Sequence, residues 1–360
     1  MKEVQHIAGI GLMSGSSLDG LDIARVEMDF RKEQGLEVLS WCITDAKTYR
    51  YPLNLVESLK SLPFESAKRF VEMDDILGRW MAEHVLDFLK FSQKRVDFIA
   101  SHGHTIFHHP RKSSTQIGNA SIIAAKTGKR TISNFRNMDT AYRGQGAPLA
   151  PFADFHLFTE YDVCINIGGI ANISFRQEKD VIGYDICGAN QILNYLSNEI
   201  GLEFDDQGKL ACEGNINPEL FQELNSLEYY REPFPKSLDN MQTMNMYVPI
   251  LNEYHIPVKD LLSTMVEHIA EKIAVAIPQL SKKILLTGGG TFNDFLVKRI
   301  KEKADTMKSF IIPEEKTISY KECLLMVLLG LFRIECLPNS LSTMTGAEKD
   351  TINGLIYLPS

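Results

Sequence analysis

Small and acidic residues gather between two apolar runs near the N-terminus, in GIGLMSGSSLDGLDIARVEM from Gly9 to Met28. Glycine carries no side chain, so backbone N–H groups in such a turn can approach phosphate oxygens closely. Asp19 and Asp22 add carboxylates, the ligands that Mg²⁺ uses beside substrate phosphates while it keeps several of its waters. The stretch therefore predicts a turn that holds a nucleotide phosphate, with Asp19 contacting Mg²⁺ through water.

Two further glycine turns, Gly168–Gly169 and Gly288–Gly290, favour the same chemistry, although any one of them alone could be only a tight bend. The second follows the apolar run KKILL and precedes a helical pattern, whose positive N-terminus suits a phosphate or a polar nucleotide group. The chain has neither GxxxxGK[ST] nor GxGxxG, and TGKRT at 127–131 lacks the earlier glycine. The turns thus indicate a nucleotide site that is neither a P-loop nor a dinucleotide fingerprint.

Four histidines lie close together in the sequence. His102 and His104 form an HxH pattern after an apolar strand, and His108 and His109 follow. Spaced histidines of this kind bind zinc in metal-dependent enzymes. Hydrogen bonding to a polar substrate is the other role open to them, and the residues alone do not choose between the two.

The elements that must position these residues alternate between strands and helices after an opening made of strands alone. Residues 6–13, 21–29 and 36–44 are typical of strands separated by turns, which predicts an antiparallel hairpin followed by a third strand. Apolar residues then recur at helical spacing from Ser66 to Phe91, and VDFIA at 96–100 predicts a short buried strand.

A second strand–glycine–strand unit, DVCINIGGIANISF at 162–175, has the same plan as the first. The strand DVIGYDI, the helices ANQILNYLSNEIG and LSTMVEHIAEKIAVAI, and the strand KKILL follow it. Two halves that each begin with a glycine-turned hairpin indicate an internally duplicated α/β architecture, with a boundary near residues 130–140.

Composition limits the classes of function. The 360 residues suggest two domains, and 44% hydrophobic with 23% charged residues is the make-up of an ordinary soluble globular protein. The formal net charge of −8 disfavours nucleic acid or an anionic membrane as the main partner. The apolar run LLMVLLGLF at 324–332 is much shorter than the roughly 20 residues that span a bilayer, and it predicts a buried helix. Because no signal-peptide pattern or CxxC motif is present, we expect a cytoplasmic protein.

Seven segments occur in the order and approximate spacing found in 1,6-anhydro-N-acetylmuramic acid kinases: GLMSGSSLDGLD, SHGHTIFHHP, NFRNMDTAYRGQGAPLAP, NIGGIANIS, GYDICGAN, LLTGGGTFND and TMTGAE. These enzymes resemble the wider actin, hexokinase and Hsp70 group of ATPases. The resemblance implies an α/β fold of two RNase H-like (actin-like ATPase) domains with an interdomain ATP cleft. It places an N-terminal domain at 1–133, completed by 345–360, and a C-terminal domain at 134–344.

Members of this family are similar in using ATP and Mg²⁺ to hydrolyse the 1,6-anhydro ring and phosphorylate O6 together, which yields N-acetylmuramic acid 6-phosphate from recycled cell-wall fragments. A water attacks the anomeric carbon while the departing O6 attacks the γ-phosphate, so the reaction needs a carboxylate base and charge stabilisation around the phosphoryl group. Asp185 in GYDICGAN matches the family's base, although an aspartate here could instead cap the following helix. Arg136 matches the FRxxD element, and its planar fork suits an oxyanion.

The resemblance assigns the remaining residues to two sets. The predicted substrate-binding residues are His102, His104, Asp139, Arg143, Gln145, Asn190 and Glu322. The predicted nucleotide-binding residues are Gly15, Ser16, Ser17, Leu18, Asp19, Gly20, Leu21, Asp22, Gly168, Gly169, Asn172, Gly288, Gly289 and Gly290. By the same resemblance the partners are ATP and an anhydrosugar, with no nucleic acid or membrane, and a homodimer is compatible with it.

Four departures from the family pattern fall in loops that the resemblance places near the substrate. CGAN at Cys187–Asn190 stands for GPGN, Arg143 for a glycine, Asn134 for an aspartate, and Asn119 for an acidic residue. Arg143 either pairs with the substrate's lactyl carboxylate or points to solvent. One alternative is therefore a related kinase or sugar-binding ATPase with another anhydrosugar as substrate. A second is a metal-dependent hydrolase that uses the histidine cluster.

Overall fold

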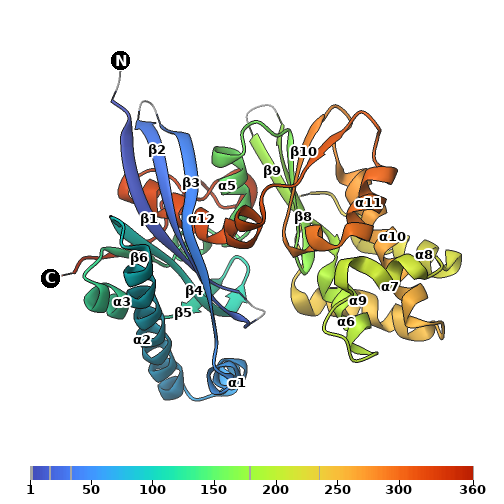
Figure 1. The fold of residues 1–360 in the computed structure, drawn as a ribbon, viewed down its shortest axis with the longest axis horizontal. Coiled ribbons are helices and arrows are strands. Elements are labelled where there is room, and N and C mark those ends of the chain that lie inside the picture. The colour runs from blue at the N-terminus through green and yellow to red at the C-terminus, as the bar shows by residue number, and fades with distance from the viewer. Residues whose placement is uncertain (1–2, 16–17, 33–34, 178–179, 235, 360) are drawn as a thin grey trace. The chain divides into compact units, whose positions relative to one another are not determined.

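The computed structural model describes residues 3–15, 18–32, 35–177, 180–234 and 236–359. The chain divides into two compact units, one made of Met1–Leu157 and Tyr320–Ser360 and the other of Phe158–Ser319 (Figure 1). Each unit contains one β-sheet with helices packed against it.

The first unit is built on a seven-stranded sheet whose main path runs β12-β6-β4-β1-β2-β3. Strands β1 to β3 form an antiparallel meander, and β4 and β6 continue parallel to β1. At the edge β12 joins β6 in the antiparallel direction, and β5 pairs with β4. The strands are β1 (Gln5–Ser14), β2 (Gly20–Lys32), β3 (Leu36–Arg50), β4 (Phe98–His109), β5 (Ser113–Ile117), β6 (Thr131–Ser133) and β12 (Leu355–Tyr357).

The helices of the first unit surround this sheet. They are α1 (Leu53–Ser61), η1 (Leu62–Phe64), α2 (Ala67–Ser92), α3 (Ala120–Thr127), α4 (Asn137–Ala141), α5 (Ala150–Leu157), α13 (Ser342–Thr345) and most of α12 (Glu315–Ile334). The Ser66 hydroxyl caps α2 by accepting from the N–H of Arg69, as its residue type favours. The run 324–332 lies within α12 and is buried, so the prediction of a buried helix is confirmed.

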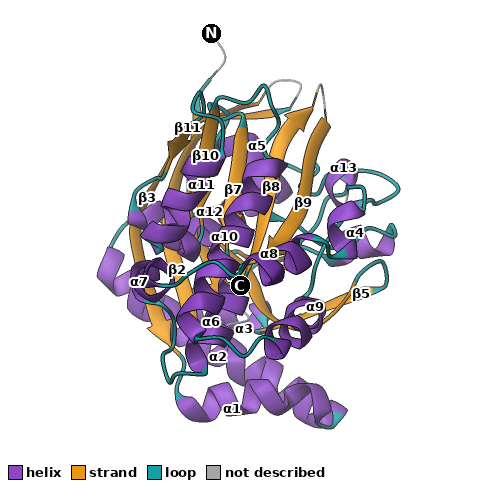
Figure 2. Cartoon of the chain, turned by 90° about the vertical axis from the view of Figure 1, so that its right-hand side faces the viewer, coloured by secondary structure: helices purple, strands orange, loops and turns teal. Residues whose placement is uncertain are grey.

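The second unit has a five-stranded sheet in the order β11-β10-β7-β8-β9. Strands β7 to β9 form an antiparallel meander, while β10 is parallel to β7 and β11 is parallel to β10. The strands are β7 (Val163–Ile167), β8 (Ile170–Gln177), β9 (Asp180–Gly188), β10 (Lys283–Thr287) and β11 (Ser309–Ile311). The helices are α6 (Asn190–Asn198), η2 (Asp206–Gly208), α7 (Lys209–Glu213), α8 (Pro218–Asn225), η3 (Glu228–Arg231), α9 (Asn240–Glu253), α10 (Val258–Ala276), η4 (Gly289–Phe292) and α11 (Asp294–Lys303). Figure 2 shows α10 and α11 in front of this sheet, where their apolar sides enter its core.

The two sheets share one plan. In each, a three-stranded antiparallel meander is extended from its first strand by two parallel strands, β4 and β6 in one unit and β10 and β11 in the other. The prediction of an internally duplicated α/β fold is therefore confirmed. The HxH histidines lie inside β4 rather than after it, because the strand continues to His109 as it pairs with β5.

The limits of the compact units differ from the expected division at residue 133. Residues 134–157 and 320–344 belong to the first unit, whereas the sequence led us to expect them in the second. Polar contacts with the C-terminal segment explain why residues 134–157 belong to the first unit. The Asn353 amide oxygen accepts from the N–H groups of Met138 and Asp139, and the N–H of Gln145 donates to the carbonyl of Thr345.

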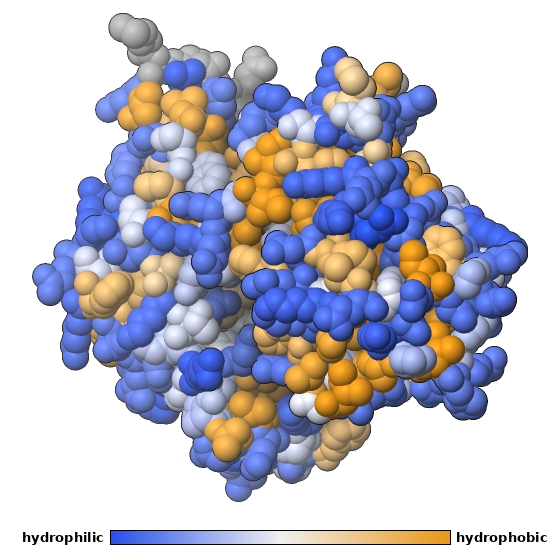
Figure 3. Space-filling model, turned by 45° about the vertical axis from the view of Figure 1, so that its right-hand side comes forward, coloured by the Kyte–Doolittle hydropathy of each residue, from blue (hydrophilic) through white to orange (hydrophobic). Residues whose placement is uncertain are grey.

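Hydrophilic residues predominate on the face drawn in Figure 3, and hydrophobic ones form several separate groups. None of the helices in the described ranges is long and apolar enough to cross a membrane.

Asn353 provides a test of how the C-terminal segment completes the first unit. Its side chain is fully buried, and Asn353→Ala would leave the N–H groups of Met138 and Asp139 without their acceptor. Since each of the two unsatisfied groups costs about 1–3 kcal/mol, we expect the free energy of unfolding to fall by roughly 2–6 kcal/mol in urea denaturation. Asn240→Ala, at an exposed position of α9, is the control and should denature with the wild type. Equal midpoints for Asn353→Ala and the control would contradict this anchoring role.

Candidate active site

The first predicted phosphate turn lies between β1 and β2. Strand β1 ends at Ser14 and β2 begins at Gly20, while Leu18 takes a left-handed backbone conformation and donates its N–H to the Gly15 carbonyl. Gly20, Leu21 and Asp22 are therefore the first residues of a strand rather than part of the turn. Two of the predicted nucleotide-binding residues, Ser16 and Ser17, lie outside the described residues.

Three carboxylates interact electrostatically beside this turn. Asp22 accepts a 2.5 Å hydrogen bond from the Thr48 hydroxyl. Burial nevertheless raises the pKa of Asp22, with a smaller contribution from the negative charge of Asp19. The side chain of Glu322 on α12 reaches solvent, but loss of hydration and the charge of Asp22 raise its pKa as well. Because like charges disfavour each other's ionised form, a cation near this cluster would be stabilised.

His102 and Arg136 form the best-defined polar pair of the first unit. The Arg136 Nε–H and Nη2–H groups donate to His102 Nε2 at 3.1 and 2.9 Å. Arginine can only donate, so Nε2 carries the lone pair, and the proton sits on Nδ1, which donates to the Gly103 carbonyl at 3.0 Å. Burial and the positive charge of Arg136 lower the pKa of His102 to about 3, so the ring stays neutral.

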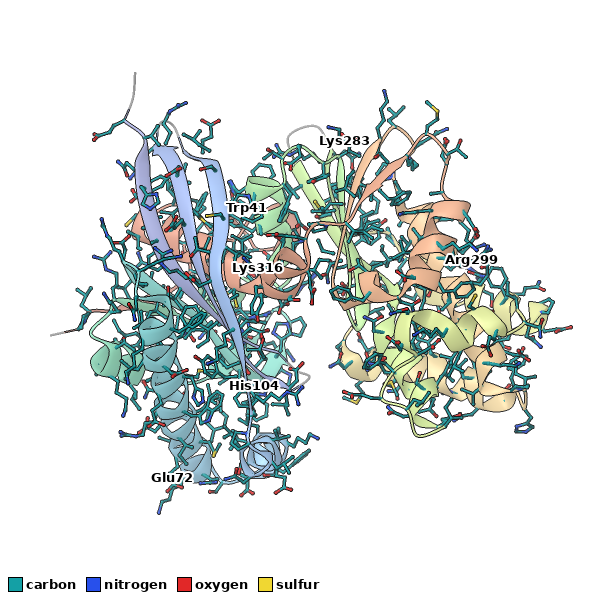
Figure 4. All side chains as sticks on the ribbon, viewed as in Figure 1. Trp41, Glu72, His104, Lys283, Arg299 and Lys316 are labelled. Carbon is teal, nitrogen blue, oxygen red and sulfur yellow. The ribbon has the colours of Figure 1, made fainter. Side chains whose placement is uncertain are left out.

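This pairing removes the basis for a zinc site. Both ring nitrogens of His102 have protein partners, and His104 Nδ1 lies 2.9 Å from the Ser14 hydroxyl, to which Tyr51 also donates at 2.8 Å. Figure 4 shows His104 at the lower end of the first unit's sheet. Within the described ranges no group of three or more His, Cys, Asp or Glu side chains is arranged to hold a metal ion. His102 and His104 therefore make hydrogen bonds within the protein, and their geometry does not support the metal-hydrolase alternative.

Arg136 keeps its charge and its position. Burial lowers its pKa to about 10, partly offset by Glu322, so the guanidinium stays protonated at neutral pH. Its Nη1–H donates to the Gly146 carbonyl at 2.9 Å. A guanidinium has five N–H donors and these contacts with His102 and Gly146 use three of them. The other donors can face an oxyanion without movement of the side chain.

Asp139, a predicted substrate-binding residue, is buried and binds protein groups. Oδ2 accepts from the N–H of Gly146 at 2.7 Å, and Oδ1 accepts from the hydroxyls of Ser340 and Thr345 at 2.9 and 2.6 Å. These contacts fix the loop that carries Gln145 and Gly146. Asp139 therefore orders the loop around Arg136.

Arg143 points to solvent in this structure. Its side chain is 82% exposed, and Nε lies 3.6 Å from the carboxylate of Glu348, which is also exposed. Its φ of 61° is left-handed, a conformation that suits the glycine of the family pattern better than arginine.

A polar cavity of about 420 Å³ opens beside His102 in the first unit. Hydrogen-bonding side chains predominate in its lining, among them Gln116, Asn119, Asn134 and Asn137. Two departures from the family pattern, Asn119 and Asn134, thus share one cavity. These amides and hydroxyls, together with the carboxyl of Asp74 in the same lining, can bind the hydroxyl and amide groups of an amino sugar.

The glycine turns of the second unit meet at Asn190. Gly168 and Gly169 connect β7 to β8, and the N–H of Asn190 donates to the Gly168 carbonyl. Asn190 Nδ2 donates to the Ile167 carbonyl at 3.3 Å and lies 3.8 Å from where a Cβ on Gly289 would stand. Asn190 therefore lies with the predicted nucleotide residues.

The three glycines after β10 have different structural needs. Gly288 has a φ of 86°, and a side chain there would meet the Ile167 carbonyl, while a side chain on Gly290 would collide with that of Ile167. Gly289 has open space instead and lines a cavity of about 410 Å³ together with Asn190, Phe204 and Phe292. The helix expected directly after the glycines begins later, at Asp294, after the short turn η4.

Asp185 lies near the end of β9, opposite Asn172 on β8. Burial raises the pKa of its carboxyl to about 6, against the effect of the Leu238 N–H, which donates to Oδ2 at 2.8 Å. The Tyr229 hydroxyl donates to the Asp185 backbone carbonyl at 2.6 Å. The N-cap of α6 is Ala189, so Asp185 is not the helix cap that its sequence position allowed.

The chain matches the family model for anhydro-N-acetylmuramic acid kinase over residues 8–359. The chain belongs to this kinase family. It is 32% identical over 372 residues to the anhydro-N-acetylmuramic acid kinase of Hydrogenovibrio crunogenus, with 97% of this chain and 98% of that protein covered. It is 34% identical to the enzyme of the same name from Coxiella burnetii, with 97% and 96% covered. Component A of (R)-2-hydroxyglutaryl-CoA dehydratase from Acidaminococcus fermentans is a distant structural neighbour, with 14% identity, a TM-score of 0.42, and 89% of this chain and 96% of that chain covered.

In each unit, residues outside the predicted sets also contact the predicted ones. Thr48 and Tyr51 contact Asp22 and Ser14, and Leu238 donates to Asp185 through its backbone. Thr48 could have been found by pairing β3 against β2 in register, since it lies opposite Asp22. A backbone donor such as Leu238 leaves no signal in its side-chain type.

Arg143→Gly should leave substrate binding nearly unchanged. An exposed ion pair is worth about 0–1 kcal/mol, so we expect the KM for the anhydrosugar to change by less than about fivefold. Glycine adopts the left-handed conformation without the strain of about 1–2 kcal/mol that arginine has there, which stabilises the fold. Glycine also gives the unfolded chain more conformational entropy, which destabilises the fold and opposes that gain. Steady-state kinetics and thermal denaturation measure both effects. A tenfold rise in KM, with Glu348→Gln unchanged as control, would show instead that Arg143 pairs with the substrate.

Proposed function

We propose that the protein is an ATP-dependent kinase that opens 1,6-anhydro-N-acetylmuramic acid by hydrolysis and phosphorylates O6, giving N-acetylmuramic acid 6-phosphate. Membership of the kinase family supports the reaction class. The observation that carries the assignment of the base is the environment of Asp185, whose carboxyl is half-buried, held by one N–H, and has a pKa raised to about 6.

Asp185 takes a proton from the water that attacks the anomeric carbon. Leu238 occupies Oδ2, so we assign proton uptake to Oδ1. A base with a pKa near 6 is ionised at neutral pH and yet accepts a proton more readily than an ordinary carboxylate. As the C–O bond breaks, O6 becomes the nucleophile for the γ-phosphate, so no separate activation of a sugar hydroxyl is needed.

Arg136 offsets the negative charge that develops on the transferring phosphoryl group. Its pKa of about 10 keeps it protonated, and His102 and Gly146 fix the plane of the guanidinium before substrate binds. Preorganised donors of this kind stabilise a transition state without reorganisation during the reaction.

The cavity at Gly289 binds ATP. It combines the apolar side chains of Phe204 and Phe292, which suit the flat base of a nucleotide, with the backbone of Gly289, which suits its phosphates. Asp205 and Asp206 also line the cavity, so the phosphates must lie toward Gly289 and away from these carboxylates. Asn190, which joins the two turns, belongs to this nucleotide site by our assignment.

Asp19 and Asp22 are the residues that would hold Mg²⁺. Burial and the charge of Asp19 raise the pKa of Asp22, and burial and the charge of Asp22 raise that of Glu322, so a divalent cation would offset the negative charge gathered here. When bound, the ion would neutralise charge on the nucleotide phosphates.

The polar cavity beside His102 receives the anhydrosugar. Asn119 and Asn134 line it in place of the acidic residues of the family pattern, so they decide how far the usual substrate is retained. Because both replacements lie in the proposed sugar cavity, a second candidate function is a kinase of the same mechanism with another anhydrosugar as its acceptor. Measuring ATP consumption across a panel of anhydrosugars separates the two.

Asp185→Asn tests the base. Asparagine has nearly the same shape but cannot accept the proton, so we expect turnover to fall at least about a hundredfold while ATP affinity stays close to that of the wild type. Wild-type kcat/KM should fall as the pH drops below about 6, because the raised pKa leaves the base protonated there. The variant should lack this pH dependence and release no ring-opened sugar without phosphate. Near-normal turnover would exclude Asp185 as the base.

Gly289→Ala tests the nucleotide cavity. Its methyl group has space in the protein but enters the cavity, so the fold should be kept while the KM for ATP rises at least about tenfold, the effect of roughly one misplaced methyl group. Gly290→Ala is the matched control, because its methyl group collides with Ile167 and should lower the melting temperature. Titration calorimetry with Mg²⁺-ATP measures the affinities. Unchanged affinity in folded Gly289→Ala would place the nucleotide elsewhere.

A further inference from the structure

The backbone around Asp185 has an interruption that requires support. Asp185 pairs with Asn172 and Cys187 pairs with Ala171, so Ile186 is an extra residue that has no partner on β8. A bulge of this kind breaks the ladder of hydrogen bonds and re-aims the side chains beside it. Because the sheet alone does not fix the strand here, other groups must hold the Asp185 carboxyl in position.

One support lies on each side of the bulge. Before it, the Tyr229 hydroxyl binds the backbone carbonyl of Asp185. After it, the N–H of Gly188 donates to the Tyr247 hydroxyl at 3.1 Å. A side chain on Gly188 would collide with Thr243 and with the ring of Tyr247, so this residue must be glycine for the tyrosine to approach.

Tyr247 belongs to a chain of hydrogen bonds that has only one direction. Asn225 Nδ2 donates to the Phe221 carbonyl at 2.8 Å, so its Oδ1 must face His268 Nδ1 at 3.1 Å, which makes Nδ1 the donor. His268 Nε2 then accepts from the Tyr230 hydroxyl at 2.8 Å. The Tyr230 oxygen accepts in turn from Tyr247 at 2.5 Å, and the Tyr247 oxygen is left to accept from Gly188.

Burial keeps this direction fixed. His268 and Tyr247 are fully buried, and loss of hydration together with Lys272 lowers the pKa of His268 to about 3. A neutral histidine cannot donate from Nε2 while Nδ1 donates to Asn225, so each hydroxyl has one orientation. The chain therefore ends in an acceptor aimed at the Gly188 N–H.

We propose that Tyr247 is a positioning residue for the reaction: through the chain from Asn225 it fixes the strand after the bulge and holds Asp185 at the attacking water. This inference rests on the proposed role of Asp185. It also gives a physical account of one departure from the family pattern, since the proline of GPGN would have no N–H to donate where this chain has Gly188.

Tyr247→Phe removes the acceptor and keeps the ring. Because a misplacement of about 1 Å can cost a hundredfold in rate, we expect kcat to fall about 10- to 100-fold, with the KM values for ATP and anhydrosugar changed less than about twofold. Amide exchange at Gly188 should accelerate. Tyr254→Phe is the matched control: it removes a hydroxyl bonded to Glu223 in the same unit and should change neither measurement.

Two further variants make the test specific. Tyr230→Phe breaks the same chain without touching the Gly188 contact, so it should lower kcat too, and the double variant should lose little more than Tyr247→Phe alone. If Tyr247→Phe does not fold, Tyr230→Phe carries the test. Asp185→Asn separates this inference from the proposed function: if it retains turnover, the base assignment fails. If Asp185→Asn loses turnover while Tyr247→Phe and Tyr230→Phe keep the wild-type kcat, the positioning role is overturned. It is also overturned if the loss of kcat in the double variant equals the product of the losses in the two single variants.

Discussion

The polar site of the first unit depends on the buried carboxylate of Asp139. Removing a charge from water is costly unless hydrogen bonds replace its hydration, and Gly146, Ser340 and Thr345 supply them. Since two of these donors lie about two hundred positions further along the chain, the carboxylate joins segments that the sequence keeps apart. The carbonyl of Gly146 accepts a hydrogen bond from Arg136, which in turn binds His102. Asp139 therefore helps to fix the position of the guanidinium through Gly146.

Both units use a buried neutral histidine to set the direction of a hydrogen-bond network. His102 must accept from Arg136 because a guanidinium has no lone pair to offer, and His268 must accept from Tyr230 because Asn225 takes its other nitrogen as donor. Burial lowers the pKa of each ring to about 3, so neither network reverses near neutral pH. The two networks support Arg136 in one unit and the strand that carries Asp185 in the other, the two residues to which we assign roles in the proposed mechanism.

Patterns within short stretches of the sequence were sufficient to predict most strands, helices and turns. Alternating strands, helical periodicity and the glycine turns gave both sheets, and the motif around Asp185 marked a carboxyl whose surroundings raise its pKa to about 6. The partners of Asp139 and the assignment of residues 320–344 to the first unit could not be predicted, because they depend on contacts between distant segments. Tyr230, Tyr247 and His268 were missed for the same reason: each is an ordinary core residue by type, and only their hydrogen bonds connect them to Gly188.

Electrostatics decides which ligands the turn between β1 and β2 can accept. Burial, with a smaller contribution from the charge of Asp19, raises the pKa of Asp22, and burial together with the charge of Asp22 raises that of Glu322. Two unit charges 4 Å apart repel by about 4 kcal/mol at an effective dielectric constant of 20. A bare triphosphate would therefore be repelled by the carboxylates that the family motif places there. A nucleotide that arrives with a divalent cation reverses the sign of that interaction, and Arg136, protonated and fixed by His102, then adds attraction toward the phosphoryl oxygens. In the proposed site, the acidic turn would therefore favour a metal-bound nucleotide over a free one, which is a physical reason for carboxylates beside a proposed phosphate site.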